Sequence, residues 1–281
     1  MKHPFLLVVL TFCVFSQYSF SQEETIAKEK YTAHNKGKFY ISWGGNRESY
    51  SKSDVTFRGE NYNFTVEDMQ AHDKPKGYHI DYINPARMTI PQTDFRLGYY
   101  ITDHYSASIG WDHMKYVMTQ NQVANVTGEI HTGEGFDGIS NHTPTAMTED
   151  FLTYEHTDGL NYINAEFARH DDVSKLLTIG NTDLIQFNIS EGLGAGVLYP
   201  KTNTKLMGRD RHDAFHVSGY GVSAKAALNI TFLKHYYIQG ELKGGYINMQ
   251  DIRTTTNPAD SAFQDFFFFQ RIIEVGGVFR I

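Results

Sequence analysis

Residues 265–281 read DFFFFQRIIEVGGVFRI, and this stretch decides the fold class. Taken at every second position from Phe269, one set of side chains is mainly apolar and the other is mixed, and such alternation is typical of a β-strand. A helix here would have to carry the Gly276–Gly277 pair and end on β-branched and aromatic residues without a cap. The stretch is therefore predicted to be a strand.

The same alternation recurs in seven further segments, which are 36–46, 94–101, 105–111, 161–169, 183–199, 219–232 and 236–246. The apolar faces tend to begin or end in an aromatic residue, as in the aromatic girdles of membrane β-barrels. The polar faces carry Gly, Ser, Asn and Gln with isolated charges of both signs, which suits a crowded lumen. An exported soluble sandwich also alternates, but its polar face would be rich in Lys, Glu and Thr. We therefore predict an all-β fold, an antiparallel transmembrane β-barrel.

The connections between these segments alternate between short and long. Short turns are expected at 102–104 and 233–236, a moderately long one at 170–182, and long external loops at 47–92, 120–157, 200–214 and 250–264. This rhythm predicts eight strands with both ends in the periplasm. Residues 53–59 and 62–69 also look like strands. They are expected to form a hairpin above the membrane, and if they span it instead, the barrel has ten strands.

The start of the sequence predicts export. Residues 1–21 combine an early Lys, an apolar run and small residues before a cut, which indicates a signal peptide that is too short to span a bilayer as a helix. Residues 22–36 are then an N-terminal periplasmic segment and residues 37–281 the barrel. The one cysteine, Cys13, lies in the signal, so the mature chain has no disulfide. A net charge of −7 argues against nucleic acid as a partner.

With these features, and with the terminal EVGGVFRI, the chain resembles the small outer-membrane β-barrel proteins of Gram-negative bacteria. Stretches such as YISWGGNRESYSKSDVTF and TIPQTDFRLGYY are similar to a subgroup without a well-defined biochemical role. The resemblance implies contact with outer-membrane lipid and lipopolysaccharide, and recognition by the barrel-assembly machinery through the C-terminal strand. Members usually end on Phe, whereas here Phe279 precedes a terminal Ile281. The resemblance to this family also implies a non-enzymatic structural or loop-mediated binding role, without a cofactor.

Six charges are expected to face the lumen. They are Arg96, Glu166, Lys225, Glu241, Lys243 and Glu274, three positive and three negative. An eight-stranded barrel has an interior just wide enough for side chains, and charges buried there must be paired. The balance of sign therefore favours structural pairs, and a narrow small-solute channel lined by the same charges is the alternative.

One short motif suggests chemistry. His216 and Ser218 are expected to share one face at the start of a strand, and their spacing resembles the His-x-Ser of outer-membrane lipid A deacylases, in which a His activates a Ser. A carboxylate would be needed to orient that His, and Glu191 and Asp213 are candidates that lie far from it in the sequence or in another segment. Catalysis is the alternative hypothesis here, not the main one. Most of the histidines are expected in polar loops, without the spacing of a metal site, and they include His131, His142, His156, His170, His212 and His216.

Overall fold

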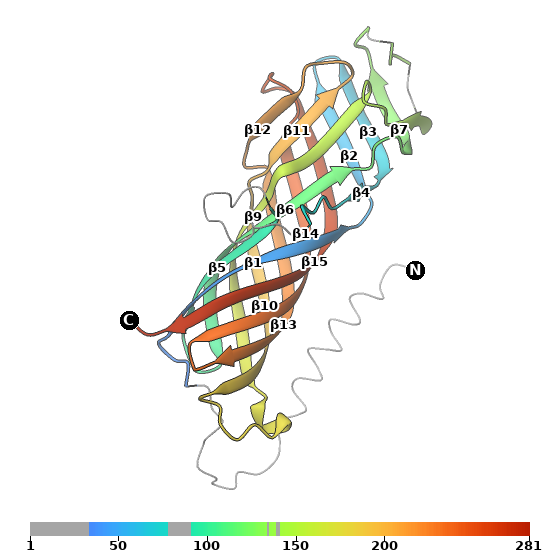
Figure 1. Ribbon diagram of the computed structural model, residues 1–281. Coiled ribbons are helices and arrows are strands. Elements are labelled where there is room, and N and C mark those ends of the chain that lie inside the picture. Colours follow the sequence, from blue (N-terminus) through green and yellow to red (C-terminus); the bar gives the residue numbers. More distant parts are fainter. Residues whose placement is uncertain (1–33, 78–90, 134, 139–140) are drawn as a thin grey trace. The chain divides into compact units, whose positions relative to one another are not determined.

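Eight antiparallel strands close into a ring in the computed structural model (Figure 1). In ring order they are β1 (Phe39–Tyr50), β5 (Thr93–Tyr100), β6 (Tyr105–Met118), β9 (Leu152–Asp172), β10 (Ile185–Leu198), β13 (Gly219–Phe232), β14 (Tyr236–Arg253) and β15 (Ser261–Phe279). The ring closes where β1 pairs with β15 along its whole length, from Phe39 opposite Phe279 to Tyr50 opposite Phe268. The predicted antiparallel barrel is confirmed.

The structure describes residues 34–77 and 91–281, apart from 134, 139 and 140. The predicted signal peptide, residues 1–21, and nearly all of the segment 22–36 lie outside the described residues. In the part of the chain that is described, no helix is long and apolar enough to cross a membrane.

The possible extra pair of spanning strands forms a hairpin outside the ring. β2 (Ser53–Gly59) pairs with the outer end of β15, from Ser261 to Gln264, and with β3 (Tyr62–Met69). With seven and eight residues, these strands are shorter than the nine to eleven that a tilted transmembrane strand needs. The ten-strand alternative is therefore wrong, and the eight-strand prediction is confirmed.

The strands are strongly tilted. When directly opposed residues are followed around the ring from Ile238, the path returns to the same strand at Asn248, ten residues further on. This offset corresponds to a tilt of roughly 40° and to an interior that side chains fill. Glycine makes room for large side chains there, since a Cβ on Gly98 would collide with the ring of Tyr40.

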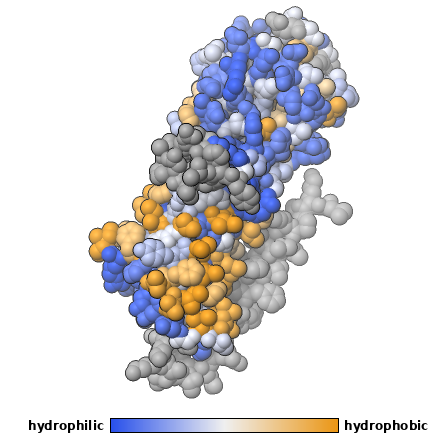
Figure 2. Space-filling model, viewed as in Figure 1, coloured by the Kyte–Doolittle hydropathy of each residue, from blue (hydrophilic) through white to orange (hydrophobic). Residues whose placement is uncertain are grey.

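The outward face of the barrel is an apolar belt (Figure 2). Its exposed residues, called the lipid-facing belt below, include Ile41, Leu97, Ile109, Ile163, Leu193, Val222, Leu228, Ile238, Leu242, Ile273 and Val275. Aromatic pairs border it at both ends: Tyr105 stacks on Phe167 near one end, and Tyr199 on Phe215 near the other. A band of apolar residues between two aromatic girdles is the surface that a bilayer requires.

The two ends of the barrel differ. Short connections at 101–104 and 233–235, and a longer one with the 3₁₀ helix η3 (Ser174–Leu177), lie at the end where β1 begins and β15 finishes. This is the periplasmic end. The other end carries additional strands, which are β4 (Ala71–His72), β7 (Val123–Ile130), β8 (Thr143–Ala146), β11 (Lys201–Leu206) and β12 (His212–Phe215). Much of what was expected to be loop is therefore sheet.

These outer strands extend the barrel wall beyond the belt. On one side β15 continues through β2, β3 and β7 to β8, and on the other β9 continues through β11 to β12. β2 shows why they form a sheet, because Val55 and Phe57 are fully buried while Asp54 and Arg58 are exposed. The buried faces share one apolar core, here called the external core, that includes Val55, Phe57, Phe64, Val66, Tyr116, Phe151, Tyr154, Met249 and Phe266.

Candidate functional site

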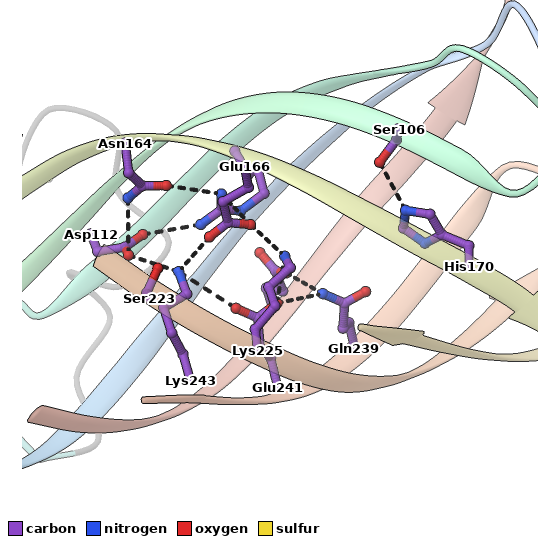
Figure 3. Close-up of polar contacts among 12 residues, drawn as sticks. Ser106, Asp112, Asn164, Glu166, His170, Ser223, Lys225, Gln239, Glu241 and Lys243 are labelled. Atoms are coloured by element: carbon purple, nitrogen blue, oxygen red, sulfur yellow. Dashed lines mark hydrogen bonds and ion pairs between the residues drawn. The ribbon is translucent and has the colours of Figure 1, made fainter. Parts of the chain in front are cut away.

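A compact ion-pair network fills the lumen at the level of the lipid-facing belt (Figure 3). We call it the lumen network, and its members are Arg96, Asp112, Glu166, Lys225, Glu241 and Lys243. Glu166 lies at its centre: its carboxylate is 2.7 Å from Arg96, 2.7 Å from Lys225 and 2.9 Å from Lys243. Five of the six lumen charges predicted from the sequence thus lie together.

Lys243 contacts all three carboxylates of the network. Its Nζ is 2.7 Å from Asp112 and 3.5 Å from Glu241, in addition to its contact with Glu166. The Arg96 guanidinium in turn is 3.2 Å from the other Asp112 oxygen. Three cations therefore face three anions, and each ion has at least two partners of opposite sign. Such mutual satisfaction is what makes buried charge tolerable.

The side chains of the lumen network are buried. Its side chains are between 0 and 6% exposed, so solvent does not reach them. The sixth predicted charge, Glu274, is also buried and accepts a hydrogen bond of 2.7 Å from the Gln239 amide, which lies next to the network. At this level the charged side chains are therefore paired with one another and shielded from solvent.

Asp112 belongs to the network but was not among the lumen charges predicted from the sequence. The predicted strand ended at Trp111, whereas β6 continues to Met118. Asp112 continues the polar set of Ser106, Ser108 and Gly110, so the alternation itself could have identified it. Asp94 was also absent from the predicted lumen charges, although it begins the predicted segment 94–101, and it lies directly opposite Asp112 and is buried.

No hydrogen bond joins the Ser218 hydroxyl to the His216 ring, and both residues are among those that the structure describes. Both lie before β13, which begins at Gly219, so strand alternation does not place them on one face. The Ser218 hydroxyl donates to the main-chain carbonyl of His216, at 3.4 Å. The His216 ring is 2.7 Å from the Asp251 carboxylate, a partner that was not among the sequence candidates. Ser218 is buried, only 3% exposed.

Two histidines expected in loops lie instead in β9. His170 faces the periplasmic end of the lumen, where its Nε2 lies 2.8 Å from the Ser106 hydroxyl (Figure 3). His156 lies in the external core region, between Tyr116 and Tyr154, with its Nδ1 3.0 Å from the Thr202 hydroxyl. Among the described residues, no three His, Cys, Asp or Glu side chains are grouped as metal ligands would be.

The outermost loops form a polar cleft of about 460 Å³, here called the tip cleft. Three segments line it: Glu60 and Asn61 after β2, residues 209–210 after β11, and residues 255–260 between β14 and β15. Its floor is held in place by Asp260, which accepts from Thr255 at 2.7 Å and pairs with Arg209 at 3.0 Å. Arg209 also lies over the Tyr62 ring, 5.1 Å from its centroid.

The external core is expected to lose stability in acid because of His156. Burial lowers the pKa of the His156 imidazole to about 3, so the ring stays neutral in the folded state when an unfolded His near 6.5 takes up a proton. A depressed pKa in the folded state means that stability falls as the pH drops below 6.5. Between pH 7 and pH 5 we expect a loss of about 2 kcal/mol.

Urea titrations at pH 7 and pH 5 measure this loss of stability. Unfolding of the external strands is monitored by their susceptibility to proteolysis. The His156→Gln variant, which cannot take up that proton, should show a smaller difference between pH 7 and pH 5. An unchanged difference in His156→Gln would assign the acid sensitivity to other groups.

No protein-family model and no curated protein matches the chain. Among solved structures, the attachment invasion locus protein Ail of Yersinia pestis matches with 11% identity and a TM-score of 0.33, over 87% of this chain and 99% of that chain. The outer membrane protein OprG from Pseudomonas aeruginosa matches with 10% identity and a TM-score of 0.37, over 88% and 98%. Neisserial surface protein A matches with 8% identity and a TM-score of 0.33, over 86% and 99%.

Sequence identities and TM-scores this low support no inference about function. The fold is assigned from the closed ring of strands in this chain. Eight antiparallel strands, a lipid-facing belt between aromatic girdles, short turns at one end and long connections at the other are the features of barrels in the bacterial outer membrane. The chain is a small β-barrel protein of the outer membrane.

Proposed function

We propose that this protein is a non-enzymatic binding protein, in which the barrel anchors the external strands and those strands contact ligands outside the cell. The observation that carries the proposal is the external core. Barrel closure needs only the eight strands of the ring, yet β2, β3, β7 and β11 also pack apolar side chains against those of the ring strands and complete an apolar core beyond the membrane. Rigid outer sheets hold their connecting loops in a fixed geometry, which favours binding.

The closed lumen argues against a channel. A conduction path through the barrel would have to pass the lumen network, whose ions are bound to one another at 2.7–3.5 Å and are shielded from solvent. Separating them would leave charges buried without partners, which is costly. The network is therefore better explained as the packing of the barrel interior.

The geometry at His216 argues against a hydrolase. A nucleophilic serine needs its hydroxyl next to the imidazole that takes its proton. Here the Ser218 hydroxyl donates to a carbonyl, and the imidazole is engaged by Asp251. The tip cleft is the better candidate for a ligand site, since it exposes carboxylate, amide, hydroxyl and guanidinium groups that suit a polar, hydroxyl-rich ligand such as a glycan.

Cells that display the protein, applied to a glycan array, test the proposal. The wild type should bind, and Phe64→Ser should abolish binding, because it removes an aromatic ring from the external core, where Phe64 is 1% exposed. Such a loss destabilises the core by about 3–5 kcal/mol. Heat-modifiable migration on gels should show that the barrel still folds. Val123→Ser is the matched control, since Val123 is 68% exposed on β7.

Conductance of the purified protein in planar bilayers is the second measurement, and no stable channel is expected. Defined conductance steps would contradict the proposal, and so would glycan binding that survives Phe64→Ser.

A further inference from the structure

An apolar groove of about 730 Å³ lies on the outside of the barrel near its periplasmic end, across β13, β14, β15, β1 and β5. This volume is within the range of roughly 300–1,000 Å³ that is usual for pockets that bind small molecules. Most of its lining residues alternate outward, and they include Ile41, Trp43, Phe95, Phe232, Tyr236, Ile238, Val275 and Gly277. Ile41, Ile238 and Val275 belong to the lipid-facing belt, so the groove is continuous with the surface that contacts lipid.

Gly277 leaves the hollow in this surface. It lies directly opposite Tyr236 on β14 and Ile41 on β1, so the row of outward side chains is interrupted at its position. Neither space nor backbone conformation requires glycine there, because a Cβ would meet only the carbonyl oxygen of His235, at 3.5 Å, and φ is not positive. Glycine weakens a strand and often marks a place where a ligand approaches the backbone closely. The missing side chain thus opens room for a ligand.

Lys234 places a positive charge at the periplasmic end of the groove. It lies in the turn that joins two of the lining residues, Phe232 and Tyr236. Its ammonium is 2.8 Å from the Asp183 carboxylate, but both side chains are more than half exposed. An ion pair this exposed contributes little to stability, so Lys234 is available to a second anion.

Arg280 adds another cation at the same end, three residues after Gly277. Its guanidinium donates to the main-chain carbonyl of Lys36 at 2.8 Å, which is a neutral acceptor. Burial and then the charge of Arg280 lower the pKa of the Lys38 ammonium, as expected where like charges lie close together. The Asp103 carboxylate partly offsets this effect, but it accepts the main-chain N–H of Lys36 at 2.8 Å. Within the described chain, no carboxylate forms an ion pair with Arg280 or Lys38.

We propose that this groove binds an acyl chain of an anionic phospholipid in the periplasmic leaflet, with the lipid phosphate at Lys234 and Arg280. Continuity with the lipid-facing belt identifies the occupant as a lipid, and the cations at the end of the groove favour a negative headgroup. The surrounding lipid tails are as apolar as the groove, so filling the groove contributes packing rather than a hydrophobic gain. Charge-assisted hydrogen bonds to the phosphate therefore supply the selectivity. The proposal does not depend on what the external strands bind.

Native mass spectrometry of the protein in maltoside micelles tests the proposal. It compares retention of phosphatidylglycerol with retention of phosphatidylethanolamine that carries the same acyl chains and an additional ammonium group. The wild type should retain phosphatidylglycerol about tenfold better. Gly277→Ile should lower that retention about fivefold, because its side chain fills the groove. Replacing both Lys234 and Arg280 with Gln should make retention of the two lipids equal. Heat-modifiable migration shows that each variant is folded.

Gly240→Ile is the matched control. Gly240 also faces outward, opposite Leu228 and Ile273, and a Cβ there would meet nothing within 4 Å, but it does not line the groove. This variant should retain phosphatidylglycerol like the wild type. Free glycerol phosphate should not displace the lipid, since it has no acyl chain.

The double Gln variant changes only exposed side chains outside the strands, so it keeps the test decisive if Gly277→Ile does not fold. Equal retention of the two lipids by the wild type would overturn the proposal. Undiminished retention in folded Gly277→Ile, an unchanged preference in the double Gln variant, or displacement by glycerol phosphate would do the same.

Discussion

Replacing Lys243 with alanine is expected to destabilise the barrel by about 3–5 kcal/mol, because it leaves buried carboxylates without their counterion. Lys243 is fully buried, and its Nζ lies within 3.5 Å of Asp112, Glu166 and Glu241. With the lysine removed, three carboxylates share only Arg96 and Lys225. The loss should appear as a lower urea midpoint for unfolding of the refolded protein in vesicles, or as failure to attain heat-modifiable migration.

Two further variants separate the ion pairs from other effects of the substitution. Lys52→Ala removes a lysine that is exposed at the start of the external region, and it should leave the midpoint unchanged. Combining Lys243→Met with Asp112→Asn removes one cation and one anion together and should recover much of the lost stability. If the double variant is no more stable than Lys243→Met alone, pairing within the lumen network is not what holds these charges.

The second large effect concerns the lipid face. Leu193→Arg is expected to destabilise the barrel by about 2–4 kcal/mol, since it places a charge near the middle of the bilayer. Leu193 is 69% exposed and lies midway along the chain between Phe187, near the start of β10, and Tyr199, which directly follows the end of β10. The measurement is again the urea midpoint in vesicles.

Leu176→Arg is the matched control. Leu176 is even more exposed, at 81%, but it lies in η3 of a periplasmic turn, in contact with water. The same substitution there should leave the midpoint unchanged. Equal losses at the two leucines would mean that the apolar surface around Leu193 does not face lipid.

The pattern of His216 and Ser218 does not specify the contacts that the two side chains make. His216 and Ser218 are two residues apart, and two residues on a strand do share a face. The strand, however, begins at Gly219. The Ser218 hydroxyl, before the strand, donates a hydrogen bond to the main-chain carbonyl of His216. The ring's actual partner, Asp251, is 35 residues away on β14 and was not among the candidates from sequence.

Alternation of side chains determined the barrel from sequence alone. Each spanning strand separates lipid from a packed lumen, so a period of two records which side of the wall each residue faces. That is why the eight strands, the outward position of Leu228 and the inward position of Lys243 all follow from the printed residues. The lengths of the connections predicted the orientation of the barrel in the membrane, because short turns face the periplasm.

Only the tertiary structure decided which of these residues meet. Alternation shows which face of a strand a residue lies on, but not where the residue lies along the barrel axis relative to residues of other strands. That position depends on the register of every strand pair around the ring. The ten-residue offset brings Lys243 to Asp112, 131 positions apart, and closure of β1 on β15 places Arg47 opposite Arg271. The external core likewise unites buried faces of strands from several connections, each too short to form a stable sheet by itself.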